Sequence, residues 1–282
     1  MQILVATYSG FCEGVAKAFN TAQALADGND VFMLGDLVHN SEVVKKLKEQ
    51  GISTVKSIDE IPASTSEKHN TVIISAHGVG PQIYKSAKEK NLNIVDTTCP
   101  WVKRAQSLAE KASLAGHTVV IVGDKGHPEV KGIKEWADPH SIIVENENEA
   151  KQVKAKGEIE IISQTTQSEE KFASLAAIIE SQNKNVIIHD TICSATGKRQ
   201  QSVIELAADV DVMLIVGDKK SANTMRLYEL SLERQPNTYW IQTADELNLQ
   251  WIGKADKVGV SAGASTPEWT VDSVIKKINA NK

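Results

Sequence analysis

The sequence predicts an α/β fold built from three related units with mainly parallel sheets. Strand-like and helix-like segments alternate along all 282 residues, which is typical of parallel α/β sheets. The pentapeptide IVGDK occurs at residues 121–125 and again at 215–219, and the offset of 94 residues also separates Cys99 from Cys193. Landmarks that recur at one spacing indicate an internal repeat.

The strand-like runs are short, rich in Val and Ile, and bounded by polar residues or Gly, as buried strands are. They span residues 2–8, 30–36, 70–77, 93–98, 117–124, 141–146, 159–165, 185–191, 211–218, 238–243 and 257–263. Amphipathic helix-like segments lie between them, for example at residues 101–116, 169–182 and 197–209.

Each repeat begins with a cysteine at a predicted strand-to-helix turn. The predicted domains are residues 13–98, residues 99–192, and residues 193–282 together with the N-terminal strand 1–12. The third unit lacks a closing strand at the C-terminus, and we expect residues 3–12 to supply it. The chain is therefore expected to close on itself in three units of similar length.

The composition argues against several classes of protein. The chain is 41% hydrophobic and 24% charged with a net charge of −5, and it has no basic stretch that would neutralise nucleic-acid phosphates. No apolar run approaches the roughly 20 residues that span a bilayer, and the N-terminus lacks the basic region of a signal peptide. Three widely spaced cysteines do not make a disulfide framework. We therefore expect a cytoplasmic protein with no nucleic-acid or membrane partner.

The three cysteines, Cys12, Cys99 and Cys193, occupy matched positions at the carboxyl ends of predicted strands, just before helices. A helix N-terminus lowers the pKa of a thiol, and parallel sheets bind ligands at this edge. Three thiolates around a common axis suit either a catalytic zinc with an open fourth position or a 4Fe–4S cluster with one iron open to substrate. Three buried apolar cysteines without a metal are the remaining alternative.

The same register places further polar side chains at the carboxyl ends of strands. They are His39, His77, His127, Thr165, Ser221, Asn223 and Ser265. Imidazoles, hydroxyls and helix N-termini together favour an anion site, particularly one for phosphate. One carboxylate, Glu129, lies two residues after His127 and is the predicted proton source, with Thr165 beside it.

Nine motifs along the chain resemble those of one enzyme family. They read GFCEGV, VHN, SAHG, DTTCP, GHPEV, SQTTQS, DTICSAT, KSANT and SAGASTPEW, and they run from residue 10 to residue 269. In this order they resemble the motifs of the 4-hydroxy-3-methylbut-2-enyl diphosphate reductase family, which completes the methylerythritol phosphate route to isoprenoids. The resemblance implies three α/β domains with pseudo-threefold symmetry around a central 4Fe–4S cluster.

The resemblance also implies roles for individual residues. Three cluster ligands match Cys12, Cys99 and Cys193, which leaves the fourth iron open to substrate. The positions that bind the diphosphate match His39, His77, His127, Ser221, Asn223 and Ser265, and the catalytic acid and its neighbour match Glu129 and Thr165. The implied reaction is the reductive dehydroxylation of (E)-4-hydroxy-3-methylbut-2-enyl diphosphate to isopentenyl diphosphate and dimethylallyl diphosphate. A ferredoxin or flavodoxin is the expected electron donor.

One position departs from the family pattern. Many relatives have Ser-Ser-Asn where this chain has Ser221-Ala222-Asn223, so one hydroxyl contact is either lost or replaced by the backbone N–H of Ala222. Two alternatives share the three-cysteine pattern: an open-iron 4Fe–4S hydratase or dehydratase, which consumes no net electrons, and a non-catalytic iron–sulfur sensor. A zinc enzyme would be colourless and stable to oxygen.

Overall fold

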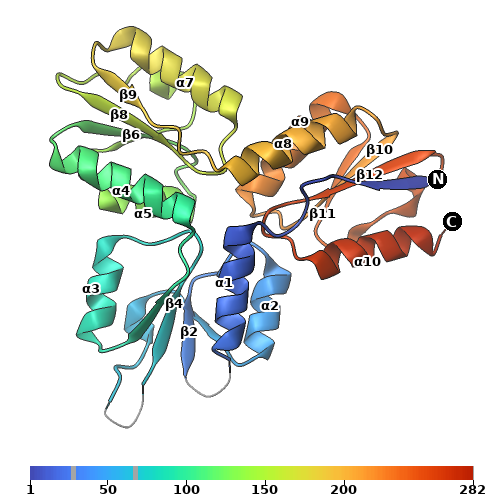
Figure 1. The fold of residues 1–282 in the computed structure, drawn as a ribbon, viewed down its shortest axis with the longest axis horizontal. Coiled ribbons are helices and arrows are strands. Elements are labelled where there is room, and N and C mark those ends of the chain that lie inside the picture. Colours follow the sequence, from blue (N-terminus) through green and yellow to red (C-terminus); the bar gives the residue numbers. More distant parts are fainter. Residues whose placement is uncertain (27–29, 66–68, 282) are drawn as a thin grey trace. The chain divides into compact units, whose positions relative to one another are not determined.

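The computed structural model describes residues 1–26, 30–65 and 69–281, and these residues form three four-stranded sheets in which every neighbouring pair of strands is parallel (Figure 1). The first sheet contains β2 (Val31–Leu34), β3 (Ser53–Val55), β4 (Thr71–Ile74) and β5 (Asn93–Asp96). The second contains β6 (Thr118–Val122), β7 (Ile142–Val144), β8 (Ile159–Ser163) and β9 (Val186–Ile188). The third contains β1 (Gln2–Val5), β10 (Val212–Val216), β11 (Thr238–Ile241) and β12 (Lys257–Ala262).

All three sheets have the same strand order. The orders are β3-β2-β4-β5, β7-β6-β8-β9 and, in the same sense, β11-β10-β12-β1. In the third sheet the N-terminal strand takes the outer place, with Gln2 opposite Lys257 and Val5 opposite Val260. The predicted α/β class, the repeat and the closing role of the N-terminal strand are therefore confirmed.

One strand was not predicted from the sequence. Strand β3 has only three residues, lies at a sheet edge, and buries Val55 while Ser53 is exposed. Unlike the equally short strands β7 (Ile-Ile-Val) and β9 (Val-Ile-Ile), Ser-Thr-Val contains only one aliphatic residue, so its pairing with β2 decides its structure.

Helices occupy the segments between the strands. They are α1 (Glu13–Ala24), α2 (Ser41–Glu49), α3 (Pro81–Glu89), α4 (Pro100–Leu114), α5 (Pro128–Trp136), α6 (Glu147–Ala150), α7 (Glu169–Gln182), α8 (Ser194–Ala207), α9 (Ala222–Arg234) and α10 (Glu268–Asn279). Short 3₁₀ turns lie at Ile58–Glu60, Ala244–Glu246 and Leu249–Trp251. Helices α3, α4 and α5 each begin with proline, whose fixed φ and missing N–H suit the first helical position. In the described ranges every helix is too short or too polar to cross a bilayer.

The central strands are apolar on both faces because helices cover both. In the third sheet, Leu214 and Val216 of β10 pack in the cluster with α10, whereas Met213 and Ile215 pack in the cluster with α8 and α9. In the second sheet, α7 covers one face and α4 with α5 covers the other (Figure 1). Strands that are buried on both faces have continuous runs of Val and Ile in their sequences, and these strands have such runs.

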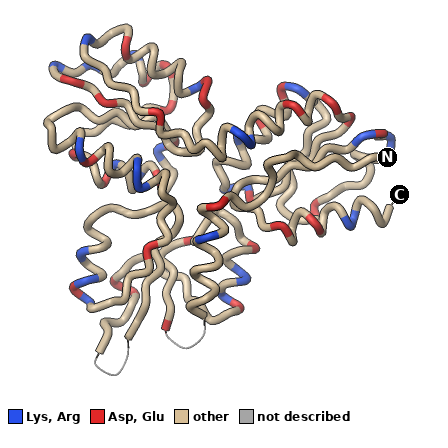
Figure 2. The backbone as a smooth tube through the Cα atoms, in the orientation of Figure 1, with Lys and Arg blue, Asp and Glu red and all other residues tan. Residues whose placement is uncertain are grey.

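The chain divides into two compact units. Unit 1 contains residues 1–16, 39–43 and 194–282 with the third sheet, and unit 2 contains residues 17–38 and 44–193 with the first and second sheets. The three predicted domain boundaries at residues 12, 98 and 192 stay predictions. Acidic and basic residues are interspersed along the described chain (Figure 2).

Candidate functional site

The predicted site residues fall into two sets, one in each unit. Unit 1 contains Cys12, His39, Ser221, Asn223 and Ser265, and unit 2 contains Cys99, Cys193, His77, His127, Glu129 and Thr165. Within each unit these residues lie in loops that follow strands or at the first residues of helices, as their register in the repeat predicts.

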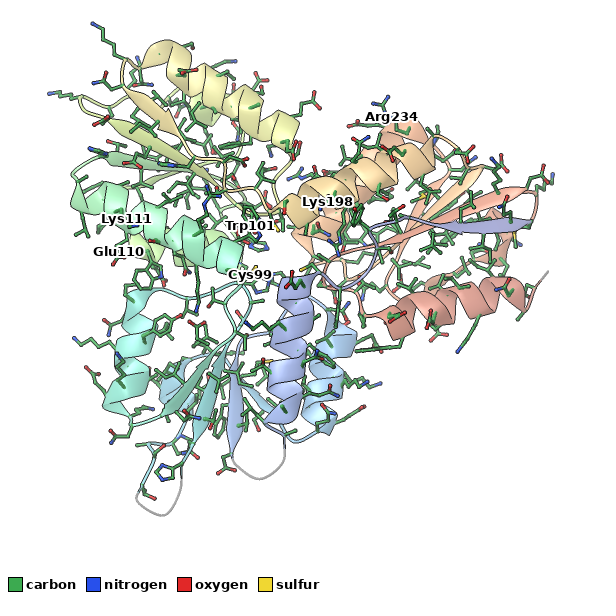
Figure 3. All side chains as sticks on the ribbon, in the orientation of Figure 1. Cys99, Trp101, Glu110, Lys111, Lys198 and Arg234 are labelled. Atoms are coloured by element: carbon green, nitrogen blue, oxygen red, sulfur yellow. The ribbon has the colours of Figure 1, made fainter. Side chains whose placement is uncertain are left out.

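The three cysteines share one backbone arrangement. Each directly precedes a helix, as Cys99 does at the start of α4 (Figure 3), and none forms a disulfide. Each cysteine N–H donates to a carbonyl in the loop after a neighbouring strand: Cys12 to Ala264 (3.1 Å), Cys99 to Ala76 (3.1 Å) and Cys193 to Thr165 (2.9 Å). All three thiols are half-buried and lie at helix N-termini.

The Asp and Thr of the repeated Asp-Thr-x-Cys motif have a structural role. The aspartate closes a turn, because Asp96 accepts the N–H of Thr98 (2.9 Å) and Asp190 accepts the N–H of Ile192 (3.3 Å). The threonine hydroxyl then donates to the neighbouring strand, from Thr97 to the Ile74 carbonyl (2.6 Å) and from Thr191 to the Ser163 carbonyl (2.9 Å). The motif therefore delivers a cysteine from a braced turn to the start of a helix.

Glu129 is a buried acid held by one residue. Its side chain is 2% exposed, and Thr165 donates its N–H to Oε1 (2.6 Å) and its hydroxyl to Oε2 (3.0 Å). Burial raises the pKa of Glu129 to about 7, although both bonds from Thr165 lower it, and the nearby Asp124 raises it further. The carboxyl group is thus able to carry and release a proton near neutral pH.

Two histidines of unit 2 form a pair, and one of them, His127, contacts the residue that carries this acid. His127 caps α5, and its Nδ1 accepts the N–H of Glu129 (3.2 Å). In the neutral ring this bond places the proton on Nε2, which is then a donor. The ring of His77 meets that of His127 edge-on, with centroids 5.4 Å apart. This pair of imidazoles therefore offers N–H donors suited to an anion.

Unit 1 contributes hydroxyls and an amide. The Ser265 hydroxyl donates to the carbonyl of His39 (3.0 Å) and lies 3.4 Å from that of Ser221, which caps α9. Asn223 is buried, yet neither atom of its side-chain amide has a hydrogen-bond partner among the described residues. A buried amide without partners is costly, so this group indicates a polar ligand.

Two further residues support the loops of unit 1, and the sequence assigned them no role. Arg199 is 6% exposed and donates to the carbonyl of Gly10 (2.9 Å), two residues before Cys12. Asp218 accepts the N–H groups of Ser41 (2.9 Å) and Lys220 (2.9 Å). Burial alone would raise the pKa of Asp218, but these bonds outweigh it and hold the pKa below its usual value. The recurrence of Gly-Asp in IVGDK was the available signal for Asp218.

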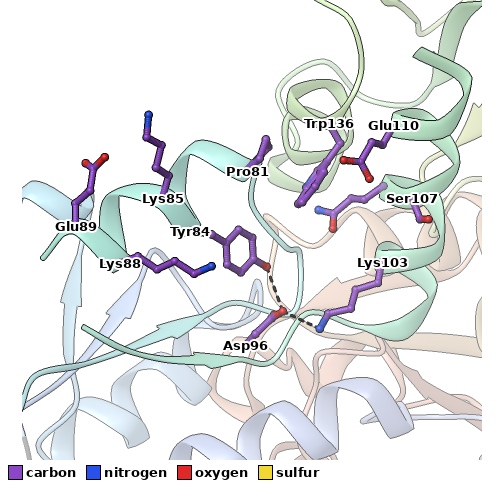
Figure 4. Close-up of a pocket in the computed structure, with 11 residues that line it drawn as sticks. Pro81, Tyr84, Lys85, Lys88, Glu89, Asp96, Lys103, Ser107, Glu110 and Trp136 are labelled. Atoms are coloured by element: carbon purple, nitrogen blue, oxygen red, sulfur yellow. Dashed lines mark hydrogen bonds and ion pairs between the residues drawn. The ribbon is translucent and has the colours of Figure 1, made fainter. Parts of the chain in front are cut away.

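A cavity of about 660 Å³ lies in unit 2 between α3, α4 and the end of α5 (Figure 4). Tyr84 and Trp136 line it, and an ion pair between Lys103 and Asp96 (2.7 Å) lies at one end. Burial raises the pKa of Tyr84 to about 12, so its hydroxyl stays protonated and donates to Asp96 (3.2 Å). The predicted site residues are not among those that line this cavity.

The raised pKa of Glu129 predicts a pH-dependent stability. The folded state holds the proton up to about pH 7, whereas the unfolded chain loses it near 4.5. The contribution of Glu129 to stability is therefore fully present below pH 4.5 and is lost as the pH rises to 7. The expected loss is on the order of 3 kcal/mol. Urea unfolding of wild type and Glu129→Gln between pH 4.5 and 8 measures it, since glutamine does not titrate. Parallel pH profiles for the two proteins would contradict this prediction.

Comparison with known proteins gives a family match over almost the whole chain. The model of the LytB protein family matches residues 3–279. The 4-hydroxy-3-methylbut-2-enyl diphosphate reductase of Alkaliphilus oremlandii is 42% identical over 99% of both chains. The enzyme of the same name from Clostridioides difficile is 38% identical over 98% of both.

Two solved structures are similar over nearly the full length. The E-1-hydroxy-2-methyl-but-2-enyl-4-diphosphate reductase of Plasmodium falciparum has a TM-score of 0.90 at 26% identity, covering 98% of this chain and 87% of that one. A structure described as (E)-4-hydroxy-3-methyl-but-2-enyl diphosphate reductase, the terminal enzyme of the non-mevalonate pathway, has a TM-score of 0.70 at 37% identity, covering 99% of this chain and all of that one.

Proposed function

The chain belongs to the LytB protein family, and we propose that it catalyses the reductive dehydroxylation of (E)-4-hydroxy-3-methylbut-2-enyl diphosphate. The products are isopentenyl diphosphate and dimethylallyl diphosphate, the outcome of the final step of the methylerythritol phosphate pathway. The observation that carries this proposal is the buried acid Glu129, whose partner Thr165 also accepts the N–H of Cys193. An acid that titrates near neutral pH and is tied to a thiol-bearing loop suits a reaction in which hydroxide leaves as water.

The family is one of iron–sulfur reductases, and we propose a single 4Fe–4S cluster with Cys12, Cys99 and Cys193 as its protein ligands. The chain has three cysteines, so one iron would lack a protein ligand. The donor set fits the group, because all three thiols lie at helix N-termini in the same braced backbone arrangement. When bound, the cluster supplies electrons and a Lewis-acidic iron for the substrate hydroxyl.

The diphosphate is bound by His39, His77, His127, Ser221, Asn223 and Ser265. Three observations support these roles: the Nε2–H of His127, the two serine hydroxyls within 3.4 Å of each other, and the partnerless amide of Asn223. Ala222 is the first residue of α9, where backbone N–H groups have no partner within the helix. Its N–H can therefore replace the missing serine hydroxyl as a donor to phosphate oxygen.

Glu129 delivers the proton that converts the leaving hydroxide to water. With a pKa of about 7, a substantial share of the carboxyl groups is protonated at neutral pH. Thr165 orients the carboxyl group through two hydrogen bonds. Overall the substrate gains two electrons and two protons and loses water, so an external electron donor is required. A small ferredoxin or flavodoxin fills this role in the proposal.

Anaerobic reconstitution with iron and sulfide, followed by an assay with a chemical reductant, tests the proposal. We expect brown protein that consumes the allylic diphosphate only when reductant is present and that forms both products. Conversion without reductant would indicate a hydratase or dehydratase. A bound cluster without turnover would indicate a sensor, and colourless, oxygen-stable activity would indicate a zinc enzyme.

A further inference from the structure

We infer that Trp136 and Gln106 are positioning residues, which hold the loop that carries His77 in register with the helices that follow Cys99 and His127. Both donate to one acceptor, the carbonyl of Val79, from Trp136 Nε1 at 2.8 Å and from Gln106 Nε2 at a longer 3.4 Å. All of these residues belong to unit 2. The inference rests on the proposed function only in taking diphosphate as the anion that His77 binds.

The shared carbonyl connects three elements of the site. Gln106 lies two turns along α4, which starts directly after Cys99. Trp136 is the last residue of α5, and His127 and Glu129 lie at the other end of that helix. The regular geometry of α5 fixes the distance between His127 at its start and Trp136 at its end. The hydrogen bond from Trp136 to Val79 therefore sets the position of His127 relative to the loop of His77.

The loop from Ser75 to Gly80 is pressed against both helices. Gly78 has a φ of 71° and closes a turn in which its N–H donates to the carbonyl of Ser75 (3.0 Å). A Cβ at Gly78 would lie 2.6 Å from Gln106 Nε2 and 2.8 Å from Thr98 Cγ2. The glycine is therefore required both for its left-handed backbone conformation and for the close approach of α4.

The same loop also meets the turn before Cys99. The carbonyl of Ala76, which precedes His77, accepts the N–H of Cys99 at 3.1 Å. On α5, a Cβ at Gly132 would lie 3.3 Å from the carbonyl of Gly78, so this helix also approaches backbone to backbone. Displacement of the loop therefore alters the spacing of His77 from both His127 and Cys99.

A packing role for Trp136 makes a different prediction. Its ring lies 6.3 Å from that of Tyr84 and lines the cavity of about 660 Å³ (Figure 4). Phenylalanine keeps most of that apolar surface but lacks the N–H. If packing is the whole role of Trp136, the Trp136→Phe variant keeps its affinity for anions. If the N–H positions the loop, affinity falls although the apolar surface is largely retained.

The test compares Trp136→Phe and Gln106→Leu with wild type, and Trp251→Phe serves as the matched control. Trp251 packs on Tyr239 in unit 1, whereas the loop belongs to unit 2. Calorimetric titration of the anaerobic holoenzyme with inorganic diphosphate gives a dissociation constant that needs no turnover. We expect it to rise about tenfold in Trp136→Phe and about threefold in Gln106→Leu, in line with one strong and one long hydrogen bond.

Steady-state kinetics then separates positioning from general damage. We expect KM to rise with the dissociation constant while kcat stays within about twofold, as when binding that is equal in ground and transition states is lost. Unchanged diphosphate affinity in both variants would overturn the inference, as would loss of kcat at constant KM. Wild-type protein that binds diphosphate without turnover would contradict the proposed function alone. Wild-type protein that fails to bind diphosphate would overturn both.

Discussion

Replacing Glu129 with glutamine is expected to lower kcat by about 10²- to 10⁴-fold, the range that general acids contribute. Glutamine has nearly the same shape. Its carbonyl oxygen accepts the N–H of Thr165 and its NH2 group donates to the Thr165 hydroxyl, so the pocket is expected to persist. Its amide has no acidic proton at neutral pH. Because the pocket persists, substrate affinity is expected to stay within about threefold of wild type. This factor corresponds to a change in binding free energy of about 0.7 kcal/mol.

The measurement is single-turnover reduction under anaerobic conditions together with substrate titration. Glu180→Gln, an exposed position on α7, makes the same chemical change away from the site and should leave turnover unaltered. A pH profile adds a second check, because wild-type kcat should fall as the pH rises above about 7 and Glu129 loses its proton. Wild-type turnover by Glu129→Gln would remove this residue as the proton source.

Replacing Cys99 with serine is expected to abolish both the iron–sulfur cluster and activity. A serine hydroxyl stays protonated at neutral pH and is a much harder ligand than thiolate, so it does not replace a soft donor. The backbone at residue 99 is braced by its own N–H bond to Ala76, and therefore the fold should survive the change. Loss of function would then come from lost ligation and not from unfolding.

Iron and sulfide content per chain, visible absorbance and the melting temperature measure these effects. Cys12→Ser and Cys193→Ser should behave alike, because both cysteines have the same backbone arrangement as Cys99. Ser113→Ala on α4 serves as a control on the same helix. If Cys99→Ser retains a full complement of iron and sulfide with turnover, the three-ligand assignment is wrong.

The fold was largely readable from local sequence. Buried parallel strands need continuous apolar runs, and these alternate visibly with amphipathic helices. The repeat also predicted a non-local feature, the pairing of the N-terminal strand β1 with β12. Strand β3 was missed because Ser-Thr-Val contains one aliphatic residue, whereas the equally short edge strands β7 and β9 are entirely aliphatic and were predicted. Aliphatic runs therefore predict even short strands, and a short strand without such a run is decided by its pairing.

The candidate site was predicted in its residue types but not in its contacts. The repeat register and the family motifs predicted Glu129 and Thr165 as site residues. The two residues lie 36 apart in sequence, so only the folded structure shows that Thr165 donates two hydrogen bonds to the Glu129 carboxylate. The pKa of about 7 follows from burial, which no local pattern contains. Arg199 was missed for the same reason, since its bond to Gly10 spans 189 residues.

The amino-acid sequence alone determined the α/β class, the threefold repeat and the matched cysteines, because these follow from spacing and residue type along one chain. Tertiary structure alone decided which groups form hydrogen bonds. Thr165 donates to the Glu129 carboxylate, and the N–H of Glu129 donates to His127 Nδ1. Trp136 and Gln106 donate to the carbonyl of Val79. The reason is physical. Burial and hydrogen-bond geometry depend on residues that are distant in sequence, so proton affinity and positioning arise only once the helices and strands have packed.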